Sequence, residues 1–144
     1  MVEGFLIRFQ KKLVSRIREL REEREIPQLE LARLVGVSRQ YIYYLERGMY
    51  NPSTTISIKI SKILGKTVEE IFFFEPVIKD LMGSKTLDEL DEMAEAIEMS
   101  VEKFMNLRKI DEDKVSKMYT EDELIKISEV LGVEFEELFI KEED

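Results

Sequence analysis

The chain has 144 residues, of which 44% are hydrophobic and 37% are charged, a composition typical of one medium-sized domain or two small ones. Cysteine and histidine are both absent, so disulfide bridges, histidine-dependent catalysis and ordinary zinc sites are excluded. No apolar run of about 18 residues could span a membrane, and no pattern typical of a signal peptide is present. We therefore expect a cytoplasmic protein that binds neither a metal nor a membrane.

Charge is divided unevenly along the chain. The net charge of −9 is unfavourable for a nucleic-acid binder, but residues 1–75 carry 13 Lys and Arg against 10 Asp and Glu, whereas residues 76–144 carry 9 against 21. Such an asymmetry predicts two domains with different partners. The run Phe72-Phe73-Phe74-Glu75-Pro76 marks the expected boundary, because proline interrupts the preceding structure.

The spacing of apolar residues predicts an all-α protein. Apolar residues recur at steps of three or four near the N-terminus, at Phe5, Phe9, Leu13, Ile17 and Leu20. This period predicts a first helix from about Gly4 to Glu23. Proline, serine and glycine signals predict three further helices over residues 27–36, 38–48 and 53–65, and a last helical turn over residues 68–72.

A series of residues in these elements has spacings that few families share. They are Gln28-Leu29-Glu30-Leu31-Ala32, Gly36-Val37-Ser38-Arg39-Gln40, Ile42, Leu45-Glu46-Arg47-Gly48, Asn51-Pro52-Ser53, Ile60, Leu64-Gly65 and Glu69-Glu70-Ile71-Phe72. Over roughly residues 14–74 the series resembles the lambda-repressor/Cro family of helix-turn-helix proteins. Two residues of the series also suit closely packed short helices. Ala32 is small enough to permit a close helix crossing, and Gly36 can adopt the backbone conformation of a sharp turn. The resemblance implies a five-helix DNA-binding domain.

The resemblance also implies that the helix after Ser38 is the recognition helix and enters the major groove. Arg39, Gln40 and Tyr44 are expected to contact bases, because arginine suits guanine and glutamine suits adenine. Contacts to the DNA backbone are expected from Gln28, Ser38, Tyr41, Tyr43, Arg47, Tyr50 and Asn51.

Each assignment has a simpler alternative. Arginine and glutamine on a helix surface are often merely solvated, and the tyrosines could serve packing or a dimer contact. Glu46 is acidic, which argues against contact with phosphate. By resemblance to the family it is expected to form a structural ion pair with Arg21.

The acidic half repeats part of the first half. The segments Ile125-Lys126-Ile127-Ser128, Leu131-Gly132 and Glu136-Glu137-Leu138-Phe139 follow similar segments by 67 residues, and Met93 to Leu107 echo Leu31 to Leu45 at an offset of 62. The five-residue difference between these two offsets arises within residues 108–119, as expected for a loop insertion. We expect a second, degenerate helical repeat over residues 76–144, the alternative being a chance match of amphipathic helices.

The surface of this repeat differs from that of the first. Val101 and Glu102 stand where the first half has Arg39 and Gln40, so we expect no DNA binding there. Glu98 stands in the place of Gly36, so the turn must be rebuilt or strained.

The sequence therefore predicts a sequence-specific DNA-binding transcriptional regulator of the repressor kind, which acts as a homodimer on a near-palindromic operator. Its expected partners are double-stranded DNA, a second copy and a protein bound by the acidic domain. The dimer contact is expected from the N-terminal extension, from the phenylalanine run or from the acidic domain. The candidates in the first two are Phe5, Leu6, Phe9, Phe72, Phe73 and Phe74.

Two other classes of function are considered. A protein-interaction module, such as an antitoxin or a coactivator-type bridge, would use the acidic domain and bind DNA only for autoregulation. An enzyme is not expected, because the carboxylates of Asp111-Glu112-Asp113 and Glu121-Asp122-Glu123 lie in solvated runs without a phosphate loop or metal-ligand spacing. No cofactor is expected.

Overall fold

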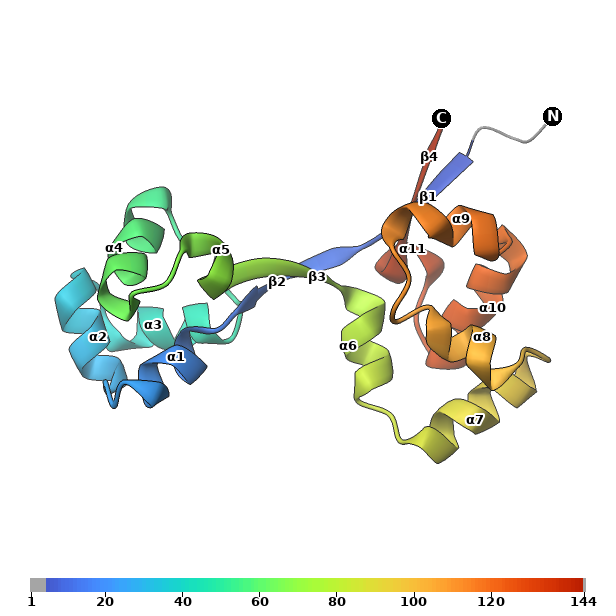
Figure 1. The fold of residues 1–144 in the computed structure, drawn as a ribbon, viewed down its shortest axis with the longest axis horizontal. Coiled ribbons are helices and arrows are strands. Elements are labelled where there is room, and N and C mark those ends of the chain that lie inside the picture. Colours follow the sequence, from blue (N-terminus) through green and yellow to red (C-terminus); the bar gives the residue numbers. More distant parts are fainter. Residues whose placement is uncertain (1–4, 144) are drawn as a thin grey trace. The chain divides into compact units, whose positions relative to one another are not determined.

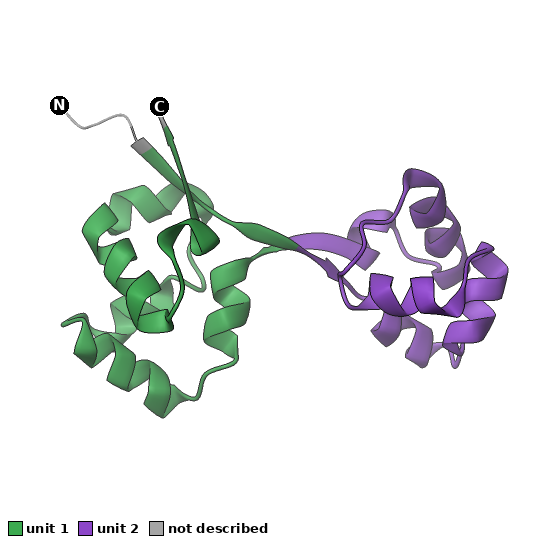
Figure 2. Ribbon diagram, turned by 180° about the vertical axis from the view of Figure 1, so that it is seen from behind, with its two compact units in different colours: residues 1–12, 75–144 green, residues 13–74 purple. Residues whose placement is uncertain are grey.

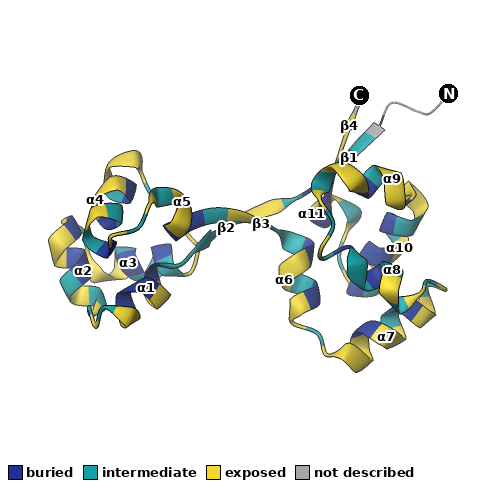
Figure 3. Ribbon diagram, viewed as in Figure 1, coloured by how far each residue is buried: buried dark blue, intermediate teal, exposed yellow. Residues whose placement is uncertain are grey.

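The computed structural model describes residues 5–143, which divide into two compact units (Figures 1 and 2). Residues 13–74 form the central unit, whereas residues 5–12 and 75–143 together form the acidic unit. Each unit buries its own cluster of apolar side chains (Figure 3). The first described residues thus belong with the C-terminal half of the chain and not, as expected, with the residues that directly follow them.

The central unit consists of short helices and one pair of strands. The helices are α1 (Ile17–Glu23), α2 (Gln28–Val35), α3 (Arg39–Glu46), α4 (Thr54–Leu64) and α5 (Val68–Ile71). Strand β2 (Lys11–Ser15) pairs with strand β3 (Phe72–Pro76), and each strand has three of its five residues in this unit and two in the acidic unit. Helices α2 to α5 begin and end within two residues of the bounds that the sequence predicts.

Serine caps and a glycine set the bounds of the helices around the expected DNA-binding turn. The Oγ atom of Ser38 accepts the N–H of Tyr41 at 3.0 Å, and that of Ser53 accepts the N–H of Ile56 at 3.2 Å. These bonds satisfy donors that the first turn of a helix leaves free. Gly36 ends α2 with a φ of 88°, in the left-handed region that glycine favours.

The expected helix over residues 4–23 is wrong in its first half. Phe5–Phe9 form strand β1, β2 follows after a single residue, and α1 begins only at Ile17; Gly4 lies outside the described residues. The buried side chains of Ile7 and Phe9 alternate with the exposed Arg8, which is the two-residue period of a strand. The apolar spacing of this segment fits both the period of a helix and the period of a strand. It forms a strand because a distant strand is available to pair with it.

That partner is strand β4 (Phe139–Glu143), which pairs with β1 in antiparallel register from Phe5 opposite Glu143 to Phe9 opposite Phe139. The strands of the two ribbons contradict the expectation of an all-α chain, although helices dominate.

The acidic unit contains helices α6 (Val77–Gly83), α7 (Leu87–Ala96), α8 (Val101–Asn106), α9 (Val115–Met118), α10 (Glu121–Leu131) and α11 (Phe135–Leu138), and the 3-10 turn η1 (Glu112–Lys114).

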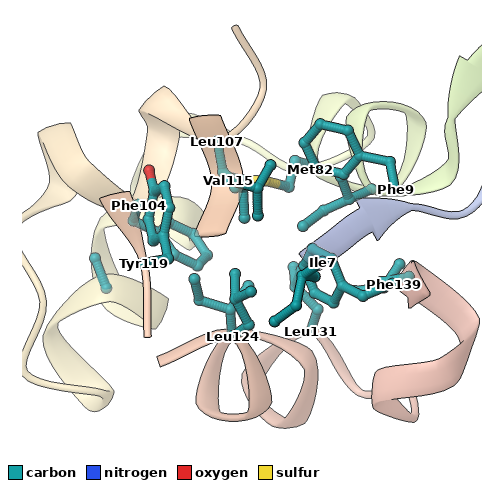
Figure 4. Close-up of a cluster of buried hydrophobic side chains, with 14 of the residues drawn as sticks. Ile7, Phe9, Met82, Phe104, Leu107, Val115, Tyr119, Leu124, Leu131 and Phe139 are labelled. Carbon is teal, nitrogen blue, oxygen red and sulfur yellow. The ribbon is translucent and has the colours of Figure 1, made fainter. Parts of the chain in front are cut away.

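The core of the acidic unit is assembled from both ends of the described chain. Ile7 and Phe9 of β1 are each only 4% exposed and lie among side chains of the helices and of β4 (Figure 4). The ring centroid of Phe9 lies 6.2 Å from that of Phe139. Phe9, an expected candidate for a dimer contact, is therefore part of this core.

The other candidates for a dimer contact differ in exposure. Phe72 is buried in the core of the central unit and Phe73 is half-buried, whereas Phe74 is 68% exposed. Leu6 is half-buried, and the side chain of Phe5 lies outside the described residues. Phe74 is thus the most accessible of the candidates whose side chains are described.

Two details of the acidic unit bear on the expected repeat. Residues 108–119 are not merely an inserted loop, because they contain η1 and α9 and bury Val115 and Tyr119. Glu98 has a φ of 54°, in the same left-handed region as Gly36. A non-glycine residue therefore holds a strained backbone conformation in the turn before α8.

We expect Phe9→Ala to lower the free energy of unfolding by about 3 kcal/mol, because it removes a buried aromatic ring and leaves a cavity. Chemical denaturation monitored by circular dichroism measures this loss. Phe74→Ala is the matched control and should cost far less, because that ring is mostly exposed. Equal losses for the two variants would mean that β1 is not part of the core.

Candidate nucleic-acid interface

Helix α3 is held from behind by its apolar side. Ile42 and Leu45 are buried in the core of the central unit, and burial of each side chain contributes about 1.5–3 kcal/mol. Rotation of α3 about its axis would expose them. The side chains of Arg39 and Gln40 in the same helix are exposed, as is that of Arg47 directly after it. Packing therefore fixes which side chains α3 presents to solvent.

A chain of hydrogen bonds leads from the interior to the surface of α3. The Nε atom of Arg21 donates to Glu46 Oε2 at 2.8 Å, and the Nε2 atom of Gln28 donates to Glu46 Oε1 at 2.9 Å. The Oε1 atom of Gln28 in turn accepts a hydrogen bond from an Nη atom of Arg39 at 3.1 Å. Gln28 thus connects a buried carboxylate with an exposed guanidinium group.

The expected ion pair between Arg21 and Glu46 is present and buried. The two side chains are 10% and 5% exposed, and Arg21 also donates to the carbonyl oxygen of Ile26 at 2.9 Å. Desolvation of both charges offsets much of their attraction, so the net stabilisation of such a pair is modest. Loss of one partner is costly, however, because the other charge stays buried without compensation. The pair therefore mainly fixes geometry.

Next to Gln40, three tyrosine side chains cover part of the exposed surface. The Nε2 atom of Gln40 donates to the hydroxyl group of Tyr44 at 3.0 Å. The ring of Tyr44 lies 5.0 Å from that of Tyr50, which in turn lies 5.6 Å from that of Tyr41. These rings hold one another in place, with edge-to-face geometry between Tyr44 and Tyr50.

Arg47 is placed by an aromatic ring. Its guanidinium carbon lies 4.7 Å from the ring centroid of Tyr43, a cation–π arrangement. The guanidinium group remains exposed and has donors free to meet an anion. The pair presents a positive charge next to a flat apolar face, which suits a sugar-phosphate backbone.

The structure brings most of the expected DNA-contacting residues to one surface. A shallow hollow is lined by Gln28, Arg39, Tyr43 and Arg47, and adjoining hollows by Ser38, Gln40, Tyr41, Tyr44 and Tyr50. The Ser38 hydroxyl oxygen already accepts the N–H that caps α3, which leaves its own proton to donate. Asn51 is exposed but lines none of these hollows.

One cation at this surface was not predicted from the sequence. Arg18 of α1 lines the same hollow as Arg39 and Arg47, and its side chain is 73% exposed. It forms a pair with Glu22, one turn further along α1. The signal in the sequence is weak, because nothing local shows that the exposed side of α1 borders α3.

The described chain shows neither a metal-ion site nor a membrane-spanning helix. Among residues 5–143, no group of acidic side chains is arranged to hold a metal ion. Over the same residues, no helix is both long and apolar enough to cross a membrane.

Comparison with known proteins matches the central unit. A profile of the helix-turn-helix family matches residues 17–71. The chain is similar to an uncharacterized HTH-type transcriptional regulator of Archaeoglobus fulgidus, with 43% identity over 61 residues, which are 42% of this chain and 87% of the relative. A regulator of the same description from Methanothermobacter thermautotrophicus is 45% identical over 60 residues, 41% of this chain and 87% of that one. The immunity repressor protein of Bacillus phage phi105 is 32% identical over 84 residues, 58% of either chain.

We expect Glu46→Gln to lower the free energy of unfolding by about 3 kcal/mol, because Arg21 then stays buried without its counter-charge. Thermal and chemical denaturation of the full chain measure the loss. Glu19→Gln is the matched control: Glu19 pairs with Arg16 at the surface, and its side chain is 57% exposed, so no measurable change is expected. If both variants are as stable as the unaltered protein, the buried pair does not hold α3.

Proposed function

Because the chain belongs to the lambda-repressor/Cro type of helix-turn-helix family, it is a transcriptional regulator with a DNA-binding domain, and we propose that it acts as a repressor of genes next to a specific operator. The observation that carries the proposal is the exposed side of α3, which presents Arg39 and Gln40 from a helix fixed by a buried ion pair. The similarity to a phage immunity repressor favours repression over activation.

In this proposal α3 lies in the major groove with its N-terminal residues next to the bases. Arg39 donates to guanine O6 and N7, and Gln40 makes a bidentate pair with adenine. The bond from Arg39 to Gln28 keeps the guanidinium group in place before DNA arrives, which reduces the entropy lost on binding. Tyr44 contacts a thymine methyl group and is steadied by its bond from Gln40.

Contacts to phosphates set the register of α3 in the groove without reading sequence. We assign them to exposed or half-exposed donors around the helix, which are Gln28, Ser38, Tyr41, Tyr43, Arg47, Tyr50 and Asn51. Arg18 is added on the basis of its place in the hollow. The central unit has 10 Lys and Arg against 8 Asp and Glu, so its affinity depends on where these cations lie and not on a large net charge.

We also propose that the acidic unit is a degenerate repeat of the central unit. Ser100 caps α8 as Ser38 caps α3, and Glu98 and Gly36 share a positive φ before those helices. Gly132 ends α10 in the same left-handed conformation in which Gly65 ends α4.

The repeat lacks the chemistry of the reading helix, because α8 begins with Val101 and Glu102 in place of Arg39 and Gln40. The residues from 75 onward hold 22 Asp and Glu against 9 Lys and Arg, and like charge keeps them from phosphates within about a Debye length, roughly 8–10 Å. We therefore assign the acidic unit to assembly or to binding of a protein partner.

A second candidate function is a protein-interaction module that binds DNA only to regulate its own synthesis. The observation that favours it is a row of exposed carboxylates along α7 and α8 for which no cation partner is seen among the described residues. They are Asp88, Asp91, Glu92, Glu95 and Glu102. In such a protein the acidic unit would bind a basic partner.

We expect Arg39→Ala and Gln40→Ala each to relax base preference at one position of each half-site, with about 1–3 kcal/mol of discrimination lost. Arg47→Ala should weaken all sequences alike and flatten the dependence of affinity on salt by about one unit of slope. Selection of bound duplexes from a random pool, followed by fluorescence anisotropy titrations at several salt concentrations, measures both effects.

The control is Lys126→Ala, which removes an exposed cation from the acidic unit and should change neither motif nor slope. Selection of an unchanged motif by both α3 variants would show that this helix is not the reader. If the unaltered protein selects no motif at all, the interaction module becomes the better account.

We expect the full chain to be a symmetric dimer at micromolar concentration, because one recognition helix reads too few base pairs for useful specificity. Light scattering measures the mass in solution. The selected operator should be a near-palindrome whose half-sites lie about 34–36 Å apart, one turn of the double helix. A monomer with and without operator DNA would contradict this prediction.

A further inference from the structure

A hollow beside the first turn of α3 is lined by uncharged side chains. Its lining residues are Ser38, Gln40, Tyr41, Tyr44 and Tyr50. A neighbouring hollow is lined in part by exposed cations, which are Arg18, Arg39 and Arg47. The two hollows therefore suit different groups of a DNA duplex, because cations attract phosphates, whereas aromatic faces accept apolar groups.

Tyr50 lies against two rings of α3, although it belongs to the segment that follows the helix. Its ring centroid lies 5.0 Å from that of Tyr44 and 5.6 Å from that of Tyr41. Tyr41 and Tyr44 are half-buried, whereas Tyr50 is 45% exposed. The three rings thus support one another and leave part of their apolar surface open to solvent.

Gln40 connects this hollow with the expected reading of bases. Its Nε2 atom donates to the hydroxyl group of Tyr44 at 3.0 Å. A glutamine amide has a second N–H and an acceptor oxygen, and these two groups suffice for a bidentate pair with adenine. The partner of that adenine is thymine, whose C5 methyl group points into the same groove. The hollow therefore lies where a base edge with a methyl group is expected.

We propose that this hollow takes the C5 methyl group of a pyrimidine and that Tyr50, outside α3, is a further residue that determines base specificity. The inference rests on the proposed function, and it extends the contact of Tyr44 to a site built from three rings. The hydroxyl groups of Tyr41 and Tyr50 still serve the phosphate contacts assigned above, because a tyrosine ring and its hydroxyl group are separate binding surfaces.

A methyl group fits this hollow better than a sugar of the DNA backbone does. Each sugar lies between two phosphates, and the five described residues that line the hollow include no cation to receive them. A methyl group, by contrast, brings no charge with it. Loss of one methyl group from an apolar contact costs about 0.8 kcal/mol, which is about fourfold in affinity.

Replacement of thymine by uracil in the selected operator tests the site, because the two bases differ only in this methyl group. Each thymine of one half-site is replaced in turn, and fluorescence anisotropy with the full chain measures the affinity. We expect about a fourfold loss at one thymine, in the base pair whose preference Gln40→Ala relaxes or in a neighbouring pair. At that position 5-methylcytosine should bind about fourfold more tightly than cytosine.

Variants of Tyr50 show whether the hollow is responsible. Tyr50→Ala should bind thymine and uracil alike, whereas Tyr50→Phe should keep the fourfold preference because its ring remains. Met49→Ala is the matched control and should also keep the preference. Met49 is the preceding residue and is 62% exposed, but it is not among the residues that line the hollow.

The methyl site is overturned if uracil costs no affinity at any thymine, or if Tyr50→Ala and the unaltered protein lose equally. Equal binding of cytosine and 5-methylcytosine at the sensitive position also counts against it. In each case the proposed function stands if Arg39→Ala and Gln40→Ala still relax the selected motif. If the unaltered protein selects no motif, the proposed function fails and the methyl site fails with it.

Discussion

The position of α3 in the central unit depends on one buried carboxylate. Glu46 of α3 accepts hydrogen bonds from Arg21 of α1 and from Gln28 of α2, so three helices meet at a single charge. A charge that is only 5% exposed must be met by donors in fixed positions. Gln28, whose side chain is fixed by Glu46, also accepts a hydrogen bond from Arg39. The buried carboxylate thus helps to fix a side chain at the surface. The position of the exposed Arg39 guanidinium group is thus linked to a charge in the core.

Much of the central unit could be predicted from the sequence because its signals are local. Ser38 and Gly36 act on the helices that they directly bound, and the apolar period of α3 shows which side chains face outward. The Arg21–Glu46 pair followed from resemblance to a family. The bond between Arg39 and Gln28 could not be predicted, since it depends on the conformations of two long side chains at the surface.

The N-terminal strand could not be predicted for a different reason. The spacing of Phe5, Phe9 and Leu13 fits one side of a helix, while Ile7 and Phe9 also fit alternate positions of a strand. What decides is β4, whose residues lie at least 130 positions further along the chain. No local pattern carries that information, and hydrogen bonding to a distant partner overrides local helical spacing.

In the proposed repeat, the acidic unit keeps a helical core while its surface changes. At buried positions such as Ala94 and Phe104, packing restricts which residue can be accommodated. The exposed positions of α7 and α8 carry no such restriction, so their charge can change. Glu98 is the exception, because it keeps a left-handed conformation that disfavours a side chain. Such strain persists where the surrounding fold determines the backbone.

The pairing of the first strand with the last also fixes the order in which the protein is completed during synthesis. Residues 13–74 carry all the partners of their own core, so this part can fold soon after β3 leaves the ribosome. Strand β1 is made earlier but must wait for β4, with Ile7 and Phe9 exposed to solvent meanwhile. The unit with the helix-turn-helix is therefore complete while the acidic unit is still a nascent chain.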